Sequence, residues 1–260
     1  MRIALGVAYR GTAYHGWQSQ SDGKTVQDRL EAALAAFADV PLRVVCAGRT
    51  DAGVHALQQV VHLDTGVERA ADSWVRGTNR YLPDDIAVQW AMSVSDSFDA
   101  RRSAHGRRYT YRLLESPVRP SLEAGQVGWS FRPLDHAAMQ QAAAVLIGEN
   151  DFSAFRSAEC QAATPVRMLR SIDIFRRGAY WRFDFDANAF LYHMVRNIMG
   201  CLTMIGSGRR TPAWLADVMA SRDRSRAAPT MAPDGLYFVG PYYDPAYAIP
   251  DRSRSADWLS

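Results

Sequence analysis

An arginine and an aspartate lie between two glycines in the segment CAGRTDAGVHALQQVVHLDT, residues 46–65, where Gly48 and Gly53 flank Arg49 and Asp51. An aspartate beside glycines is typical of a tight turn, because Asp caps nearby backbone amides and glycine readily adopts positive φ. A carboxylate presented by such a turn can also act as a nucleophile or a base. The segment alone favours a simple turn, and both interpretations stay open at this point.

A second group of polar residues is strongly basic. The segment FDARRSAHGRRYTYR, residues 98–112, contains a single acid and five arginines, which are Arg101, Arg102, Arg107, Arg108 and Arg112. Strand alternation puts Tyr109 and Arg108 on opposite faces. Arginines interleaved with tyrosines are typical of a surface that binds an RNA backbone and stacks on bases. An edge strand protected by charge is the alternative interpretation.

The third candidate is an arginine in an apolar helix, within FLYHMVRNIMGCLTMIGSG. Helical spacing predicts a buried stripe formed by Leu191, Met194, Val195, Ile198, Leu202 and Ile205. His193, Arg196, Asn197 and Gly200 fall on another side of the helix. Arg196 must therefore find an anion or extend its side chain to water.

These residues do not favour a metal site. Asp51 with His55, and His62 with Asp64, could each supply ligands, but neither pair forms part of a zinc signature such as H-E-x-x-H. The three cysteines are far apart and unpaired by spacing, which argues against a zinc site or a disulfide framework.

Composition indicates a soluble, cytoplasmic protein. The chain has 260 residues, 48% of them hydrophobic, and His193 and Arg196 interrupt its longest apolar stretch, so no membrane span is expected. The first residues alternate as a strand and do not resemble a signal peptide. The net charge is only +3, but Lys24 is the single lysine, and arginine is the better bidentate ligand of phosphate.

Hydrophobic periodicity predicts the elements that must position these residues. Each half of the chain reads strand, helix, strand, strand, with predicted ranges 2–9, 25–39, 42–48 and 57–65, then 107–116, 133–148, 168–175 and 180–187. The second half adds helices over 189–208 and 212–223 and a strand over 235–240. This order predicts an α+β fold, in which two ferredoxin-like halves share a largely antiparallel sheet with flanking helices and a central cleft.

The predicted domain limits follow from that order. Residues 1–105 form an N-terminal α/β half that carries the Asp51 loop, and residues 106–245 form a C-terminal α/β half. Residues 246–260 contain proline and serine and are expected to form a surface tail.

Seven segments together resemble the bacterial tRNA pseudouridine synthase A family, from residue 3 to about residue 240. They are YRGTAYHGWQSQ, VQDRLEAAL, CAGRTDAGVHALQQVVHLDT, FDARRSAHGRRYTYR, NDFSAFRS, NAFLYHMVRNIMG and AAPTMAPDGLYFVG. The chain departs from the family pattern at Arg10, Ser19, Asp99 and Arg102, where the family commonly has an acidic residue, a basic residue, His and Phe.

The resemblance implies an isomerase that converts uridine to pseudouridine at positions 38, 39 and 40 of the tRNA anticodon stem-loop, as a homodimer without a cofactor. It implies that Asp51 is the nucleophile, Arg49 its neighbour in the same block, Tyr109 the uracil-contacting residue and Arg196 the partner of the aspartate. Together with the basic segment, it suggests Arg101, Arg107, Arg108 and His193 as further tRNA-binding residues.

These residue types suit that chemistry. The reaction breaks the bond from ribose C1′ to uracil N1 and joins C1′ to C5, and a carboxylate can attack C1′, attack C6 or act as a base through a glycal. An arginine beside Asp51 would keep the carboxylate ionised, which gives Arg196 an anion. A uridine in a stem must also leave its stack, at a cost of a few kcal/mol. Stacking on Tyr109 would offset roughly 1 to 3 kcal/mol of that.

Two other functions remain as alternatives. A non-catalytic RNA-binding module would bind tRNA with steep salt dependence and form no product. A metal-dependent hydrolase built on Asp51, His55, His62 and Asp64 would lose activity in a chelator.

Overall fold

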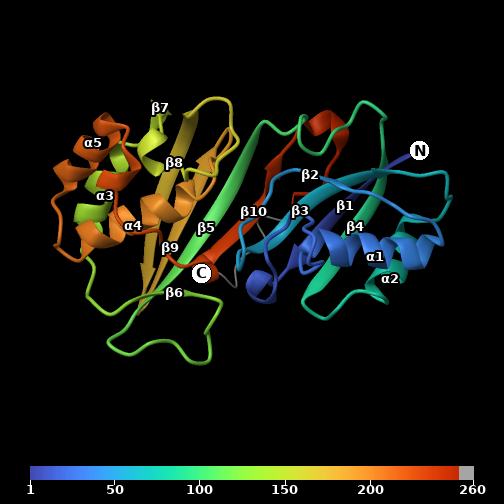
Figure 1. Cartoon of the computed structure of the whole chain (residues 1–260), viewed down its shortest axis with the longest axis horizontal. Coiled ribbons are helices and arrows are strands. Elements are labelled where there is room, and N and C mark those ends of the chain that lie inside the picture. Colours follow the sequence, from blue (N-terminus) through green and yellow to red (C-terminus); the bar gives the residue numbers. More distant parts are fainter. Residues whose placement is uncertain (252–260) are drawn as a thin grey trace. The chain divides into compact units, whose positions relative to one another are not determined.

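The computed structural model describes residues 1–251 and divides into two compact units. The first unit contains Met1–Gly106 and the described chain from Tyr237 onward, and the second contains Arg107–Leu236. The described residues form ten strands and five α-helices, which confirms the α+β class (Figure 1). The central cleft expected between the halves stays a prediction.

Four strands of the first unit lie in the order β4-β1-β3-β10. Their bounds are β1 Arg2–Tyr9, β3 His55–Asp64, β4 Ile86–Val94 and β10 Leu236–Tyr242. Strand β1 is antiparallel to both β3 and β4, and β10 runs parallel to β3, with Tyr237 opposite His55. The short β2, Val45–Cys46, also pairs with β3. The sequence prediction put the last strand in the C-terminal half, whereas β10 pairs with β3 of the first unit.

The first unit also contains α1, Val26–Ala38, and α2, Ala71–Asn79. The predicted cap of α1 is confirmed, because the Thr25 side chain accepts a hydrogen bond from the Asp28 amide. Helix α2 and strand β4 were not predicted. The two helices pack closely: a Cβ at Gly77 of α2 would lie 2.1 Å from the Phe37 ring of α1.

Four strands of the second unit lie in the order β5-β9-β8-β7. Their bounds are β5 Gly106–Glu115, β7 Gly148–Asp151, β8 Val166–Arg177 and β9 Tyr180–Ala187, and β6, Gly128–Ser130, pairs in parallel with β5. The aromatic alternation predicted for β9 is confirmed, since Trp181, Phe183 and Phe185 are buried together.

The second unit contains α3, His136–Ala144, α4, Met194–Gly206, and α5, Pro212–Ser221. The predicted N-cap of α3 is confirmed, because Asp135 accepts from the Ala138 amide. The predicted start of the long helix was wrong: α4 begins at Met194 and not near residue 189, since His193 has a left-handed backbone with φ of 63°. Short 3₁₀ helices occupy Gly11–Ala13, Ser153–Phe155, Arg224–Arg226, Pro233–Gly235 and Pro245–Tyr247.

Within residues 1–251, no helix is long and apolar enough to cross a membrane. Residues 252–260 of the predicted tail lie outside the described part of the chain.

Candidate active site

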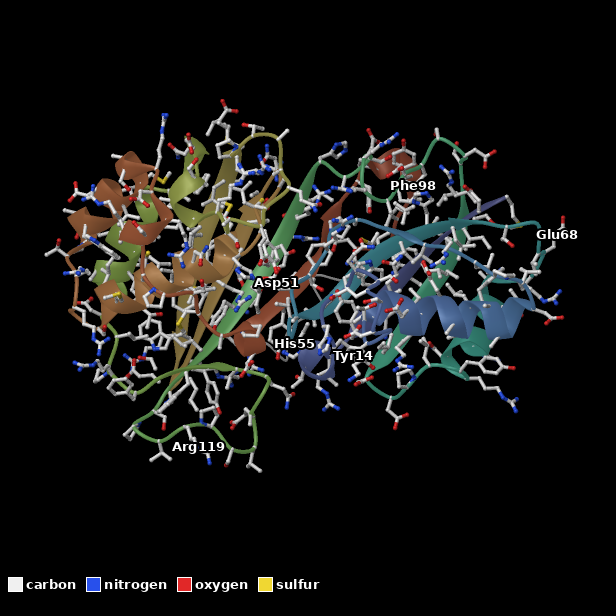
Figure 2. The ribbon with its side chains drawn as sticks, viewed as in Figure 1. Tyr14, Asp51, His55, Glu68, Phe98 and Arg119 are labelled. Carbon is white, nitrogen blue, oxygen red and sulfur yellow. The ribbon has the colours of Figure 1, made fainter. Side chains whose placement is uncertain are left out.

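Asp51 lies in the loop between β2 and β3 of the first unit (Figure 2). The residue before it, Thr50, is buried and is held twice: its hydroxyl shares a 2.8 Å hydrogen bond with the Tyr9 hydroxyl, and its carbonyl accepts from the Trp17 amide at 3.0 Å. Arg49 is exposed and Asp51 is half-buried. The loop is therefore fixed at Thr50, and the two charged side chains flank the fixed point.

The chain turns directly after Asp51. The Val54 amide donates to the Asp51 carbonyl at 3.1 Å, and Gly53 has φ of 79°, as expected for a glycine in this turn. Gly48 has a different role from the one expected, because its φ is not positive. The Gln59 side chain instead clamps both of its peptide groups, donating to the Gly48 carbonyl at 2.5 Å and accepting from its amide at 3.4 Å.

The segment YRGTAYHGW runs against this loop. A Cβ at Gly11 would lie 2.0 Å from the Val54 carbonyl oxygen, and one at Gly16 would lie 2.8 Å from that of Thr50. The Gly11 amide donates to His55 Nδ1 at 3.0 Å, and the His55 ring stacks on Tyr237 at 4.6 Å. Glycine is required at both positions because the two backbones touch.

Three of the four side chains considered as metal ligands have other partners. His55 and His62 each accept a backbone hydrogen bond on Nδ1, and Asp64 forms an ion pair with Arg2 at 2.8 Å. No three His, Cys, Asp or Glu side chains within residues 1–251 are placed to share a metal ion.

Tyr109 lies on β5 of the second unit, opposite Phe185 of β9. Tyr109, Tyr111 and Leu113 are all buried, as the alternation predicts. The Phe190 ring packs edge-on against Tyr109, with centroids 5.0 Å apart and planes at 84°. The Phe190 ring thereby helps to bury Tyr109, which has only 9% of its surface exposed.

Arg196 is the third residue of α4 and is half-buried. Its Nε donates to the Met231 carbonyl at 2.8 Å, and the Met231 amide donates to the Arg196 carbonyl at 3.2 Å. Burial raises the pKa of Tyr111, and the nearby positive charge of Arg196 opposes this. The guanidinium therefore lies near the Tyr111 side chain of β5 and is fixed by the segment AAPTMAPDG.

Asn197, the residue after Arg196, connects three of the segments that carry the family resemblance. It is fully buried, and its side-chain nitrogen donates a hydrogen bond to the Phe155 carbonyl at 2.8 Å. Its side-chain oxygen accepts from the Thr230 hydroxyl at 2.6 Å and from Arg224 at 3.0 Å. A Cβ at Gly200 would lie 2.2 Å from the Pro229 carbonyl oxygen, so the same segment also lies against α4. This buried network fixes the first turn of α4.

The other basic candidates are distributed over both units. Arg101 is exposed in the first unit, whereas Arg107 and Arg108 are half-buried on β5 of the second. Arg107 donates to the Asn188 carbonyl at 3.1 Å. His193 precedes α4 and stacks on Tyr192 with centroids 4.1 Å apart.

The sequence analysis missed two further arginines beside Arg107. Burial lowers the pKa of Arg167, the charge of Cys160 opposes this, and the like charges of Arg156 and Arg107 lower it further, so the three arginines lie near one another. Arg156 stands in the segment NDFSAFRS, which was a signal for it, whereas Arg167 had none beyond its charge.

The predicted residues thus belong to two groups. Arg49 and Asp51 share one loop of the first unit, and Tyr109, Arg196 and His193 belong to the second. The pairing of Asp51 with Arg196 stays a prediction.

Known proteins match most or all of this chain. A family model described as tRNA pseudouridine synthase matches residues 6–101 and 142–244. The chain is 70% identical to tRNA pseudouridine synthase A of Methylibium petroleiphilum and 62% identical to that of Polaromonas naphthalenivorans, each over the full length of both chains. Among solved structures, a chain of a Cbf5-Nop10-Gar1 complex matches over 91% of this chain and 48% of its own, with a TM-score of 0.43 and 11% identity.

Proposed function

Because this chain belongs to the tRNA pseudouridine synthase family, whose members are isomerases, we propose that it converts uridine to pseudouridine in tRNA, at positions 38, 39 and 40 of the anticodon stem-loop. We also propose that it works in the cytoplasm, as its composition indicates, and as a homodimer, as the resemblance implies. The observation that carries the proposal is the Asp51 loop, in which a half-buried carboxylate follows a pinned threonine and precedes a tight turn.

Asp51 is the proposed nucleophile. In the reaction the C1′–N1 bond breaks, the base turns, the C1′–C5 bond forms, and the proton lost from C5 is balanced by one gained at N1. No electrons are gained or lost overall, and a single carboxylate is enough to stabilise or trap the detached sugar or base. A loop held at Thr50 and Gly53 keeps that carboxylate in one place, which is the usual requirement for attack at a defined carbon.

Tyr109 and Arg196 are the proposed partners of the reacting groups. Tyr109 would contact the extruded uracil, and its edge-on packing against Phe190 supports this role by fixing the ring plane. Arg196 would keep Asp51 ionised and oriented, with Arg49 beside the carboxylate in the same loop. The hydrogen bond of Arg196 Nε to the Met231 carbonyl supports this role, because it fixes the guanidinium in place.

The remaining arginines are assigned to the tRNA backbone. Arg101, Arg107 and Arg108, with His193, are the predicted contacts, and the cluster formed by Arg107, Arg156 and Arg167 extends them. Like charges beside one another favour a polyanion, because a phosphate relieves their mutual repulsion.

The Asp51→Asn variant tests the proposal. The amide has nearly the same shape as the carboxylate but cannot act as a nucleophile, so we expect a folded protein that binds tRNA and releases no tritium from uridine labelled at C5. Asp72→Asn, at an exposed position in the first turn of α2, is the matched control and should retain full turnover. Turnover of Asp51→Asn near the native rate would refute the role of Asp51. Native protein that binds tRNA but forms no pseudouridine would instead support a binding module.

A further inference from the structure

The exposed Arg101 stands in a short turn that is itself ordered by a side chain. In this arginine turn, residues 98–103, the Asp99 carboxylate accepts from the amides of Arg101 at 2.9 Å and Arg102 at 2.8 Å. The Asp99 amide in turn donates to the Ser103 hydroxyl at 3.0 Å. Burial raises the pKa of Asp99, but the two amides and the nearby arginine charge outweigh this and lower it, so the carboxylate stays ionised. The Asp99 carboxylate therefore binds backbone amides of the turn, and Arg101 and Arg102 are exposed to solvent.

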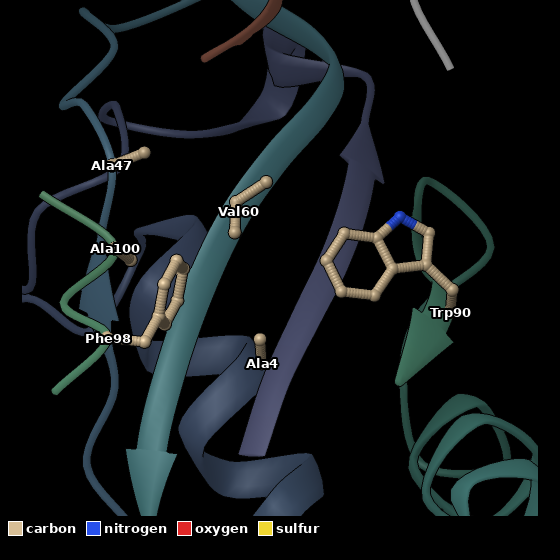
Figure 3. Packing of buried hydrophobic residues seen from close by; sticks show 6 residues of the cluster. All are labelled: Ala4, Ala47, Val60, Trp90, Phe98 and Ala100. Carbon is tan, nitrogen blue, oxygen red and sulfur yellow. The ribbon is translucent and has the colours of Figure 1, made fainter. Parts of the chain in front are cut away.

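The turn is anchored in the core of the first unit. Phe98 and Ala100 are fully buried in a cluster with Ala4, Val60 and Trp90, which come from β1, β3 and β4 (Figure 3). Phe98 and Ala100 are buried and the next two residues are exposed, so the arginines directly follow a packed base.

Both backbone groups of Ala100 are bound by side chains from distant parts of the chain. The Ala100 amide donates to His62 Nδ1 at 3.0 Å, across 38 residues, and the Ala100 carbonyl accepts from the Tyr243 hydroxyl at 2.6 Å, across 143 residues. A third side chain, Arg2, donates to the Phe98 carbonyl at 2.7 Å. Side chains from three distant positions therefore fix the backbone of this turn.

Two aromatic rings from the segment after β10 also support the arginine turn. Tyr243 and Tyr247 pack on Phe98 with centroids 5.0 Å and 5.2 Å away. The chain that follows β10 therefore lies on the base of the arginine turn and holds it from a second direction.

We propose that the arginine turn is a preorganised phosphate-binding element, in which Arg101 and Arg102 contact the tRNA backbone and His62 and Tyr243 are positioning residues. The inference rests on the proposed function and adds Arg102, His62 and Tyr243 to the residues assigned to tRNA binding. A turn held in one conformation loses little entropy when RNA binds, whereas an unheld turn has to be ordered by the ligand. His62 and Tyr243 consequently act on tRNA binding through the arginines and do not act on the chemical step.

Two variants, each with a matched comparison, test whether Tyr243 and His62 affect tRNA binding. Tyr243→Phe removes one hydroxyl and keeps the ring, and His62→Leu removes the acceptor of the Ala100 amide. Each should raise the KM for tRNA about three- to tenfold, the range that one lost hydrogen bond represents, with kcat unchanged. His62→Asn restores an acceptor at the position of Nδ1 and should return the KM toward the native value. Tyr81→Phe, at an exposed tyrosine of the same unit, is the control and should have no effect.

The arginines provide the second measurement. Arg101→Gln and Arg102→Gln should each raise the KM and reduce the slope of log affinity against log salt by about one. Adding Tyr243→Phe to the Arg101→Gln, Arg102→Gln double variant should cause little further rise, because Tyr243 acts through these side chains.

Several results would overturn the proposal. These are an unchanged KM in Tyr243→Phe and His62→Leu, an unchanged salt slope in the arginine variants, or fully additive effects in the combined variant. If the native protein released no tritium, the proposed function would fail separately. The same variants would then be compared by filter binding of labelled tRNA. A loss of tRNA affinity in the same variants would support the role of the arginine turn, and unchanged affinity would refute it.

Discussion

Replacing Gly11 with alanine should displace the Asp51 loop without altering any group that takes part in the reaction. The new Cβ would lie 2.0 Å from the Val54 carbonyl oxygen, where ordinary contact begins at 3.4 Å. The difference of 1.4 Å must be absorbed by backbone, because the obstructing atom is the carbonyl oxygen of Val54, the residue whose amide closes the turn after Asp51. A misplacement of about 1 Å in a catalytic group can cost roughly 100-fold in rate, so we expect kcat to fall by about 10- to 100-fold.

The assay is tritium release from uridine labelled at C5, with kcat and the KM for tRNA measured separately. Since Gly11 is not among the proposed tRNA contacts, the KM should change little. Gly66→Ala is the matched control, because a Cβ there meets nothing within 4 Å. Thermal unfolding of both variants would confirm that they fold. A folded Gly11→Ala protein with native kcat would refute the idea that this close contact positions Asp51.

Two further predictions concern the buried polar groups. Burial and the charge of Arg2 lower the pKa of His62, so its contribution to the free energy of unfolding should be complete above about pH 6.5 and should be lost as the pH falls through the lowered folded-state value. Denaturant unfolding of native protein and His62→Asn at several pH values would isolate this contribution as their difference, and parallel pH profiles would contradict it. Asn197→Ala leaves several buried groups without their partner and should reduce the free energy of unfolding by about 2 to 4 kcal/mol. Asn188→Ala, which loses an exposed hydrogen bond to the Met168 amide, is the control, and an equal loss in both would contradict the role of the buried network.

Local signals in the sequence predicted many of the elements. The caps Thr25 and Asp135 form the hydrogen bonds expected of them, and β1 and β9 have the predicted limits. These features depend on residues near one another in the chain, where periodicity and capping chemistry are informative. The turn at Gly53 was predictable for the same reason.

The features that were missed depend on residues far apart. Helix α2 is short and has few buried residues, of which Trp74 is the largest, so its pattern is weak. The parallel pairing of β10 with β3 joins residues such as Tyr237 and His55, and no local pattern reveals it. The left-handed backbone at His193 moved the start of α4, because a non-glycine residue in this conformation is uncommon and gives no compositional signal.

The motif around Asp51 shows why a functional segment can be long although its chemistry needs few groups. Thr50 pins the loop, Gly53 turns it, and His55 binds the Gly11 amide; Arg49 and Asp51 are the charged members of the loop, and neither is buried. Most of the motif therefore serves geometry, and each positioning residue is constrained by a partner elsewhere in the unit. The same relation holds in the second unit, where buried Asn197 connects the helix that carries Arg196 to two other segments. Family-specific sequence around a catalytic carboxylate is thus explained mainly by the backbone contacts that hold it, and substitutions at these supports should affect the rate before they affect tRNA binding.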